Sequence, residues 1–149
     1  MKINHIGYAV ENIENSIKDF EILGFEKISE ITEDITRKVR IVFIKNESYV
    51  LELIEPMVED SPVSKIIKKV GNTPYHLCYE TNNIDLEIHR LLKNKFLKIS
   101  EAENALALKN KKVCFLYKKS IGIIELVEKK SIPAIKREES LKKGNLPIK

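Results

Sequence analysis

The alternation of apolar and polar residues in the first part of the chain predicts five elements. Residues 3–10 alternate as a strand does, with bulky side chains on one face and smaller or polar ones, including His5 and Gly7, on the other. Asn12 is a typical helix N-cap, and the apolar positions after it recur at helical spacing until Gly24. Three further strands are expected at about 25–31, 39–44 and 49–54, which completes the order βαβββ.

The rest of the chain repeats this order after a linker. Ser61-Pro62 predicts the cap and first turn of a short linker helix. Residues 102–110 fit either a strand or a loop. The other expected elements are a strand at 75–81, a helix after the N-cap Asn83, a weak strand at 96–99, and strands at 113–117 and 123–127.

Two short motifs also recur at nearly one spacing. His5-Ile-Gly-Tyr and His76-Leu-Cys-Tyr lie 71 residues apart, and Glu52 and Glu125, each late in an apolar strand, lie 73 residues apart. Unrelated features that recur at nearly one offset indicate a duplicated unit. We therefore predict an α+β fold of two tandem βαβββ modules, at about 2–55 and 74–128, within one domain of residues 1–128.

The net charge of +4 does not belong to this predicted domain. Residues 129–149 hold seven Lys or Arg and two Glu, which gives a tail of charge +5. The remaining 19 basic and 20 acidic residues leave −1 for residues 1–128. A basic tail alone does not support nucleic-acid binding, and we expect no nucleic-acid partner. The tail is expected to be loosely held, with one helical stretch near 136–143.

The two cysteines and the apolar runs bear on location. Cys78 and Cys114 lie inside apolar runs without C-x-x-C spacing, which is typical of small buried residues in a reducing compartment. No apolar run approaches the roughly 18 residues that cross a membrane, and the first residues form a strand pattern rather than a signal segment. We predict a cytoplasmic protein with no membrane partner.

Four residues form the candidate site: His5 and Glu52 from the first module, and His76 and Glu125 from the second. Each glutamate lies between apolar residues on its own strand face, where an unpaired charge would cost several kcal/mol. A divalent cation would remove that penalty, and imidazole with carboxylate suits Fe, Co, Ni, Mn or Zn. The small residues beside His5 are expected to leave room for a group other than protein. We predict that the four side chains converge on one metal ion.

Other recurring polar residues have simpler interpretations. His89 falls on the polar face of its helix and is expected at the surface. Glu55 and Glu128 end their strands and are expected to be solvated. Tyr8 and Tyr79 recur on the helix-packed strand face, where packing explains them.

Paired βαβββ units with a His on the first strand and a Glu on the last resemble the vicinal oxygen chelate superfamily. Its methylmalonyl-CoA epimerase branch is the most similar. The segments that carry this resemblance are Asn4-His-Ile-Gly-Tyr-Ala-Val10, Asp60-Ser-Pro-Val-Ser-Lys-Ile66, Tyr75-His-Leu-Cys-Tyr79 with Asn83-Ile84, and Phe115-Leu116 with Gly122-Ile-Ile-Glu-Leu126.

The resemblance implies a curved mixed sheet around a central metal-binding cleft that holds one divalent ion, with Co, Ni, Zn or Mn as candidates. It implies a metal-dependent epimerase that abstracts a proton next to a metal-chelated carbonyl, with Glu125 as ligand and general base and Glu52 as ligand and second catalytic carboxylate. A small-molecule substrate, an acyl thioester or a hemithioacetal, and a homodimer are expected with it.

Departures from the epimerase pattern keep other functions open. Epimerases often carry Gln where Glu52 stands, so the two-His, two-Glu set looks more like a bacterial glyoxalase I. They commonly show His-His at Tyr75-His76, and one carries a second catalytic Glu that matches Arg40 here. The alternatives are a glyoxalase I-type lyase and a non-catalytic ligand-binding or resistance protein. An extradiol dioxygenase is disfavoured, because those enzymes use two His and one carboxylate.

Overall fold

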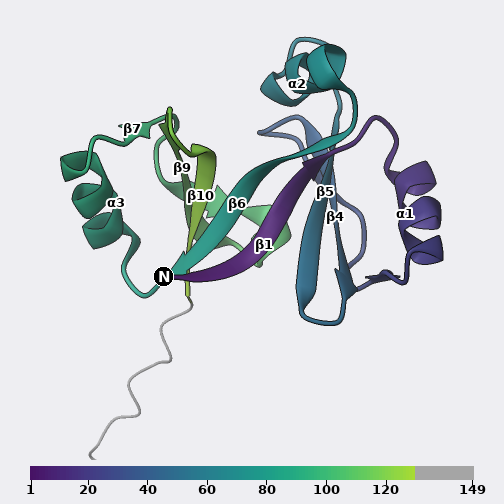
Figure 1. The fold of residues 1–149 in the computed structure, drawn as a ribbon, viewed down its shortest axis with the longest axis horizontal. Coiled ribbons are helices and arrows are strands. Elements are labelled where there is room, and N and C mark those ends of the chain that lie inside the picture. The colour runs from purple at the N-terminus through teal and green to yellow at the C-terminus, as the bar shows by residue number, and fades with distance from the viewer. Residues whose placement is uncertain (130–149) are drawn as a thin grey trace, which may run out of the picture.

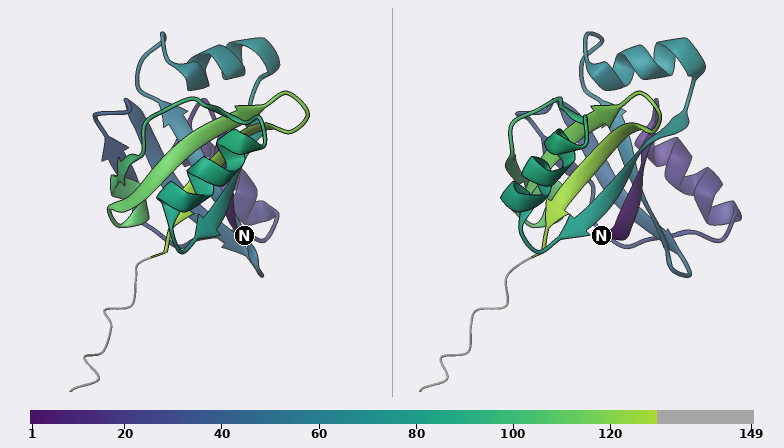
Figure 2. Two further views of the ribbon diagram at one scale, coloured as in Figure 1. Left: turned by 90° about the vertical axis from the view of Figure 1, so that its left-hand side faces the viewer. Right: turned by 60° about the vertical axis from the view of Figure 1, so that its left-hand side comes forward.

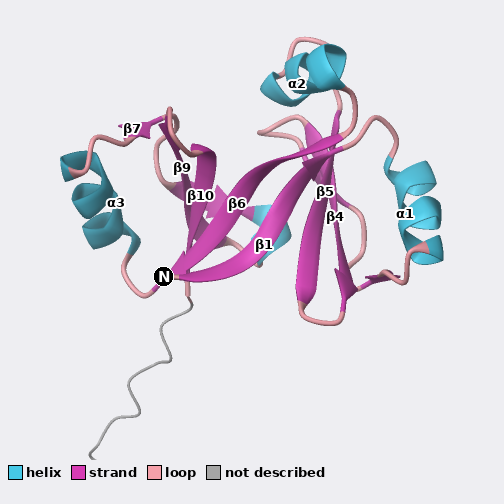
Figure 3. Ribbon diagram, viewed as in Figure 1, coloured by secondary structure: helices cyan, strands magenta, loops and turns pink. Residues whose placement is uncertain are grey.

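The structure, a computed structural model, describes residues 1–129, and one ten-stranded mixed sheet runs through them. The fold is α+β, and the sheet is open and curved with three α-helices around it (Figure 1). Figure 3 shows the strands meeting in the middle, with the helices at the periphery. The predicted tail helix near 136–143 lies outside the described residues.

The first half of the chain contains the predicted elements in order. They are β1 (Lys2–Ala9), α1 (Ile13–Ile22), β2 (Glu26–Lys27), β3 (Thr32–Asp34), β4 (Val39–Asn46) and β5 (Tyr49–Pro56). The strand expected at 25–31 is present only as the short β2, and β3 was not expected; the two pair with β4 at different points. Between them, the Ser29 hydroxyl accepts a hydrogen bond from the backbone of Phe43 and interrupts the ladder.

The linker helix α2 (Pro62–Val70) leads into the second half, which repeats the order. Residues 102–110 form a short strand and a 3₁₀ turn, so neither alternative considered for them is sufficient. The elements are β6 (Thr73–Thr81), α3 (Ile84–Lys93), β7 (Leu97–Lys98), β8 (Glu103–Ala105), η1 (Leu106–Leu108), β9 (Lys111–Lys118) and β10 (Gly122–Glu128).

Side-chain caps start all three α-helices. The side chains of Asn12, Ser61 and Asn83 accept hydrogen bonds from the third residue after each of them, as predicted. Glu55 and Glu128 are not simply solvated, contrary to the sequence prediction. Each accepts a hydrogen bond from the first backbone N–H of the helix in its own half, Glu55 from α1 and Glu128 from α3. There the negative charge also lies at the positive end of the helix dipole.

The two halves meet through β1 and β6, which pair antiparallel in the middle of the sheet. On either side, β5 runs parallel to β1 and β10 runs parallel to β6. Figure 1 shows α1 and α3 on opposite outer sides of this arrangement, and Figure 2 shows α2 apart from both, at one end of the sheet. The strands β1, β5, β6 and β10 therefore have strands on both sides, and their inner faces form the centre of the molecule.

The apolar residues divide between the two halves. One buried cluster lies under α1 and includes Val42, Leu51 and Leu53, and a second lies under α3 and includes Leu116 and Leu126. Leu23, Val70 and Leu92 are exposed, because each lies at or near the end of its helix. Among the described residues, no helix is long and apolar enough to cross a bilayer.

Candidate metal centre

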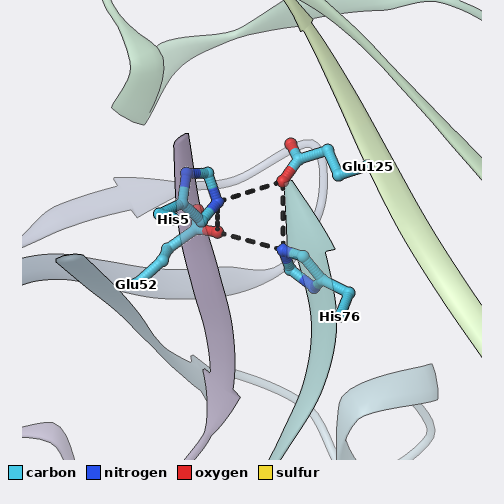
Figure 4. Close-up of side chains that lie close together, drawn as sticks. All are labelled: His5, Glu52, His76 and Glu125. Carbon is cyan, nitrogen blue, oxygen red and sulfur yellow. Dashed lines mark hydrogen bonds and ion pairs between the residues drawn. The ribbon is translucent and has the colours of Figure 1, made fainter. Parts of the chain in front are cut away.

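The four predicted ligands come together at the centre of the sheet. His5 lies on β1, Glu52 on β5, His76 on β6 and Glu125 on β10, so the four central strands supply one side chain each. Figure 4 shows the imidazoles and the carboxylates pointing toward one another. One donor atom from each residue lies within 4.8 Å of the other three. All four residues are at most 5% exposed, so the cluster is buried.

The distances between neighbouring donor atoms are short. Nε2 of His5 lies 2.8 Å from Oε2 of Glu52 and 3.2 Å from Oε2 of Glu125. Nε2 of His76 lies 3.5 Å and 3.0 Å from the same two oxygens. A metal ion about 2.1 Å from each ligand holds neighbouring donor atoms roughly 3.0 to 3.4 Å apart. The cluster therefore has the dimensions of a metal site.

His76 also fits a metal ligand better than a hydrogen-bonded core residue. Both of its ring nitrogens are buried and have no hydrogen-bond partner of suitable geometry in the described chain, although Nε2 lies near both carboxylates. A buried polar atom without a partner is costly. Coordination of a divalent ion through Nε2 would remove that cost for Nε2, and two imidazoles with two carboxylates are a donor set for Co, Ni, Zn or Mn.

The cluster's own charges shift its protonation. Burial alone would lower the pKa of His5, but the charge of Glu52 and hydrogen bonds to Cys78 and the two glutamates outweigh burial and raise this pKa to about 12. The two glutamates also outweigh burial at His76 and raise its pKa. The two imidazoles in turn hold the pKa of both glutamates below the ordinary value, against the effect of burial. Without a metal ion the carboxylates are therefore ionised and the imidazoles protonated, and a metal ion bound here would displace the imidazole protons, since a ligand histidine must be neutral.

An outer hydrogen-bond relay orients His5. Its Nδ1 lies 2.7 Å from the side-chain oxygen of Asn4, and the Asn4 amide donates to Glu80 on β6 at 2.7 Å. Asn4 is an extra residue in β1, because Ile3 pairs with Tyr79 and His5 pairs with Cys78. This bulge lets consecutive side chains serve one site. An acceptor at Nδ1 leaves Nε2 free to bind a metal, the usual arrangement around a ligand histidine.

Gly7 makes room for His76. A Cβ atom at Gly7 would overlap the His76 imidazole ring, so only glycine fits opposite that ligand. The space expected beside His5 for a group other than protein is therefore filled by this ring. In the second half the residue equivalent to Gly7 is Cys78, which is fully buried and pairs with His5 across the strands.

A cavity of about 350 Å³ adjoins the cluster, and both Glu52 and Glu125 line it. One wall is apolar and comes from β4, β5 and α2, with Val39, Ile41, Ile54, Val63 and Ile66. Further polar residues line it, among them Arg37 and Tyr75, which sequence reasoning did not assign. The one sequence signal for a role of Tyr75 in the site was that epimerases commonly carry His at this position.

Arg40 does not belong to this site. It lies on the opposite face of β4 from Val39 and Ile41, and its guanidinium pairs with Glu14 at 2.6 Å and with Glu55 at 3.0 Å. The correspondence of Arg40 with a second catalytic residue is therefore wrong. His89 is exposed on α3, as predicted, and has no place in the cluster.

A comparison with known protein families finds a match that contains most of the cluster. The family model described as Glyoxalase/Bleomycin resistance protein/Dioxygenase superfamily matches residues 4–115, which include three of the four cluster residues. The chain belongs to this superfamily. Within the superfamily, the vicinal oxygen chelate fold accounts for the duplicated halves and for the central cluster.

Several relatives are methylmalonyl-CoA epimerases. The chain is 28% identical to the human mitochondrial enzyme over 128 residues, which cover 84% of this chain and 72% of the relative. It is 27% identical to an uncharacterized protein of Bacillus subtilis, covering 87% and 93%. Similarity to the epimerases supports an epimerase-like enzyme of the vicinal oxygen chelate type.

Solved structures share the fold. A Streptomyces coelicolor methylmalonyl-CoA epimerase variant in complex with 2-nitronate-propionyl-CoA has a TM-score of 0.78 at 22% identity, covering 89% of this chain and 96% of that one. A hypothetical protein from Bacillus halodurans has a TM-score of 0.77 at 26% identity, covering 87% and 95%.

Proposed function

We propose that this protein is a metal-dependent epimerase that removes and returns a proton next to the carbonyl of an acyl thioester such as methylmalonyl-CoA. The observation that carries the proposal is the position of two buried carboxylates, Glu52 and Glu125, which belong to the four-residue cluster and also line the cavity. The epimerase relatives support the same substrate class.

The four residues His5, Glu52, His76 and Glu125 would hold one divalent ion. When bound, such an ion supplies Lewis-acid stabilisation of charge on a substrate oxygen, which acidifies the neighbouring C–H bond. The chain's own residues would provide the rest of the chemistry. The strands hold the two carboxylates on either side of the imidazoles, and the apolar wall keeps water from the reacting carbon.

Glu125 is the proposed general base. Its Oε2 atom faces both imidazoles, whereas its other carboxylate oxygen points away from them in Figure 4 and is available for a proton. The neighbouring imidazoles hold the pKa of Glu125 below its ordinary value, so the group is ionised at neutral pH. Glu52, with a matching position in the first half, is the proposed partner on the other side of the substrate carbon.

A glyoxalase I-type reaction is the second candidate, and the donor set of two His and two Glu is the observation that favours it. Both reactions begin with proton abstraction beside a chelated oxygen and differ in where the proton returns. A binding protein of the same fold would hold metal without turnover. Cytoplasmic location and a homodimer stay predictions, the latter open to sedimentation analysis.

Metal analysis followed by proton–deuterium exchange tests these candidates. We expect purified protein loaded with Co²⁺ to exchange the C2 proton of methylmalonyl-CoA and to be inert toward the glutathione hemithioacetal of methylglyoxal. Exchange with the hemithioacetal alone would support the glyoxalase reaction. A metal-loaded protein that exchanges neither substrate would contradict the enzyme proposal.

A further inference from the structure

Tyr75 is an extra residue in β6, placed one position before the cluster residue His76. In the pairing of β1 with β6, Gly7 lies opposite His76 and Tyr8 lies opposite Pro74, so Tyr75 has no partner on β1. A bulge breaks the alternation of a strand, and bulges next to active sites re-aim side chains. Consecutive residues therefore face the same side here: His76 joins the cluster and Tyr75 lines the cavity. Their rings meet edge to face with centroids 4.6 Å apart.

The other polar groups of the cavity wall already have partners. The Ser61 hydroxyl accepts from the backbone of Ser64 at 3.0 Å, and the Ser100 hydroxyl accepts from the backbone of Phe115 at 3.1 Å. Arg37 lies 3.7 Å from Asp34 and 3.6 Å from Glu103, so its charge is balanced by two carboxylates.

The hydroxyl of Tyr75 differs from these groups, because no hydrogen bond within residues 1–129 uses it. Its ring packs against the apolar cluster that includes Ile41, Ile54 and Val63. A phenylalanine would fill that space equally well, so packing explains the ring but not the oxygen. Tyr75 is half-buried, and its hydroxyl is not closed off from solvent in the cavity. Because no protein group holds this hydroxyl, it is free to exchange water for a polar group of a molecule bound in the cavity.

We propose that Tyr75 is a substrate-binding residue whose hydroxyl donates a hydrogen bond to an oxygen of the acyl group bound in this cavity. The phenol is neutral at physiological pH and is a donor that does not compete with Glu52 or Glu125 for the metal. The bond is made in the bound substrate and persists through the reaction, so it contributes to binding rather than to the chemical step. This proposal rests on the proposed function for the identity of the substrate.

Tyr75→Phe tests the proposal, with Tyr79→Phe as its matched control on the same strand. The ring of Tyr79 packs on the α3 side, away from the cavity. In Co²⁺-loaded protein we expect Tyr75→Phe to raise the KM for methylmalonyl-CoA about 3- to 10-fold, the usual worth of one hydrogen bond, while kcat stays within about twofold. Tyr79→Phe should leave both constants unchanged, and all three proteins should bind equal amounts of Co²⁺.

An unchanged KM in Tyr75→Phe would overturn the proposal, and so would a hundredfold fall in kcat at constant KM, which would assign the hydroxyl to the chemical step. Calorimetric titration with methylmalonyl-CoA measures binding without turnover, so it tests the role of Tyr75 separately from the epimerase proposal. Wild-type protein that binds this thioester without exchanging its proton contradicts only the epimerase proposal, and Tyr75→Phe should then weaken binding by the same 3- to 10-fold. Equal binding by the wild type and Tyr75→Phe overturns the role of Tyr75. A wild type that does not bind the thioester overturns both proposals.

Discussion

The two halves of the site place a bulged residue directly before each histidine, and the two bulged residues do different things. In the first half, Asn4 accepts at Nδ1 of His5 and extends the contact to Glu80. In the second half, Tyr75 leaves Nδ1 of His76 without a partner and lines the cavity instead. The duplicated backbone thus offers one position twice, and the two copies use it for different contacts: one orients a ligand, and the other faces the substrate space.

This difference means that the two ligand histidines are held in place in different ways. His5 is fixed from outside the cluster by an amide, whereas His76 is fixed from inside by close packing over Gly7 and by the rings of Tyr75 and Phe115. A ligand held by packing is sensitive to added volume. A ligand held by a hydrogen bond is sensitive to loss of its acceptor. The predictions below test that contrast.

Gly7→Ala should have the largest effect. The new Cβ would overlap the His76 ring and displace this imidazole from the cluster. We expect affinity for Co²⁺ or Zn²⁺ to fall by more than about 100-fold, beyond the range for loss of an outer-shell partner. Cys78→Ala, the equivalent position in the other half, should keep the affinity within about threefold. Competition titration with a chromophoric chelator measures both. Wild-type affinity in Gly7→Ala would show that close packing does not hold His76.

Glu125→Gln separates ligand from base. The amide keeps an oxygen that can coordinate a metal but cannot accept a proton at neutral pH. We expect turnover of methylmalonyl-CoA to fall about 100-fold or more, while most of the metal is retained. Metal content by elemental analysis and exchange rates by NMR measure the two effects. Near wild-type turnover with metal bound would remove Glu125 as the base and make Glu52 the next residue to examine.

Asn4→Ala tests the hydrogen-bonded half. Loss of the acceptor at Nδ1 frees the His5 ring to rotate, and we expect metal affinity to fall about 10- to 100-fold. Asn15→Ala, at an exposed position of α1, is the control and should bind metal as the wild type does. An Asn4→Ala protein with unchanged metal affinity would mean that the donor atoms around Nε2 alone orient His5.

Much of the site was predictable from the sequence, because the duplication places the same ligand residues in both halves. His5 and His76, and likewise Glu52 and Glu125, stand at matching places, and apolar flanks on one strand face predict buried carboxylates. The bulges at Asn4 and Tyr75 were not predictable, because a bulge depends on which residues of the partner strand lie opposite. The position of Arg40 on the outer face also depends on strand register, and so does the close approach of the His76 ring to Gly7.

Glu55 and Glu128, which accept hydrogen bonds from the first residues of α1 and α3, should show the smallest difference between the halves. A stability measurement tests this difference. Glu55 accepts from the backbone of Ile13 at 2.9 Å and also pairs with Arg40, whereas Glu128 accepts from the backbone of Ile84 at 3.2 Å. Glu55→Ala removes a cap and an ion-pair partner, so we expect it to lower the free energy of unfolding by about 1–2 kcal/mol. Glu128→Ala removes the cap alone and should cost about 0.5–1 kcal/mol.

Urea unfolding monitored by circular dichroism measures both losses, with the exposed Glu59→Ala as the control for removal of a surface charge. The slope of each transition should match that of the wild type, since the surface exposed on unfolding is nearly the same. Metal affinity should be unchanged in all three variants, because neither cap belongs to the cluster. Equal losses in Glu55→Ala and Glu128→Ala would show that Arg40 contributes nothing through Glu55. The Arg40 guanidinium would then be stabilised by Glu14 alone, and the two halves would be equivalent at their helix starts even though they differ at their bulges.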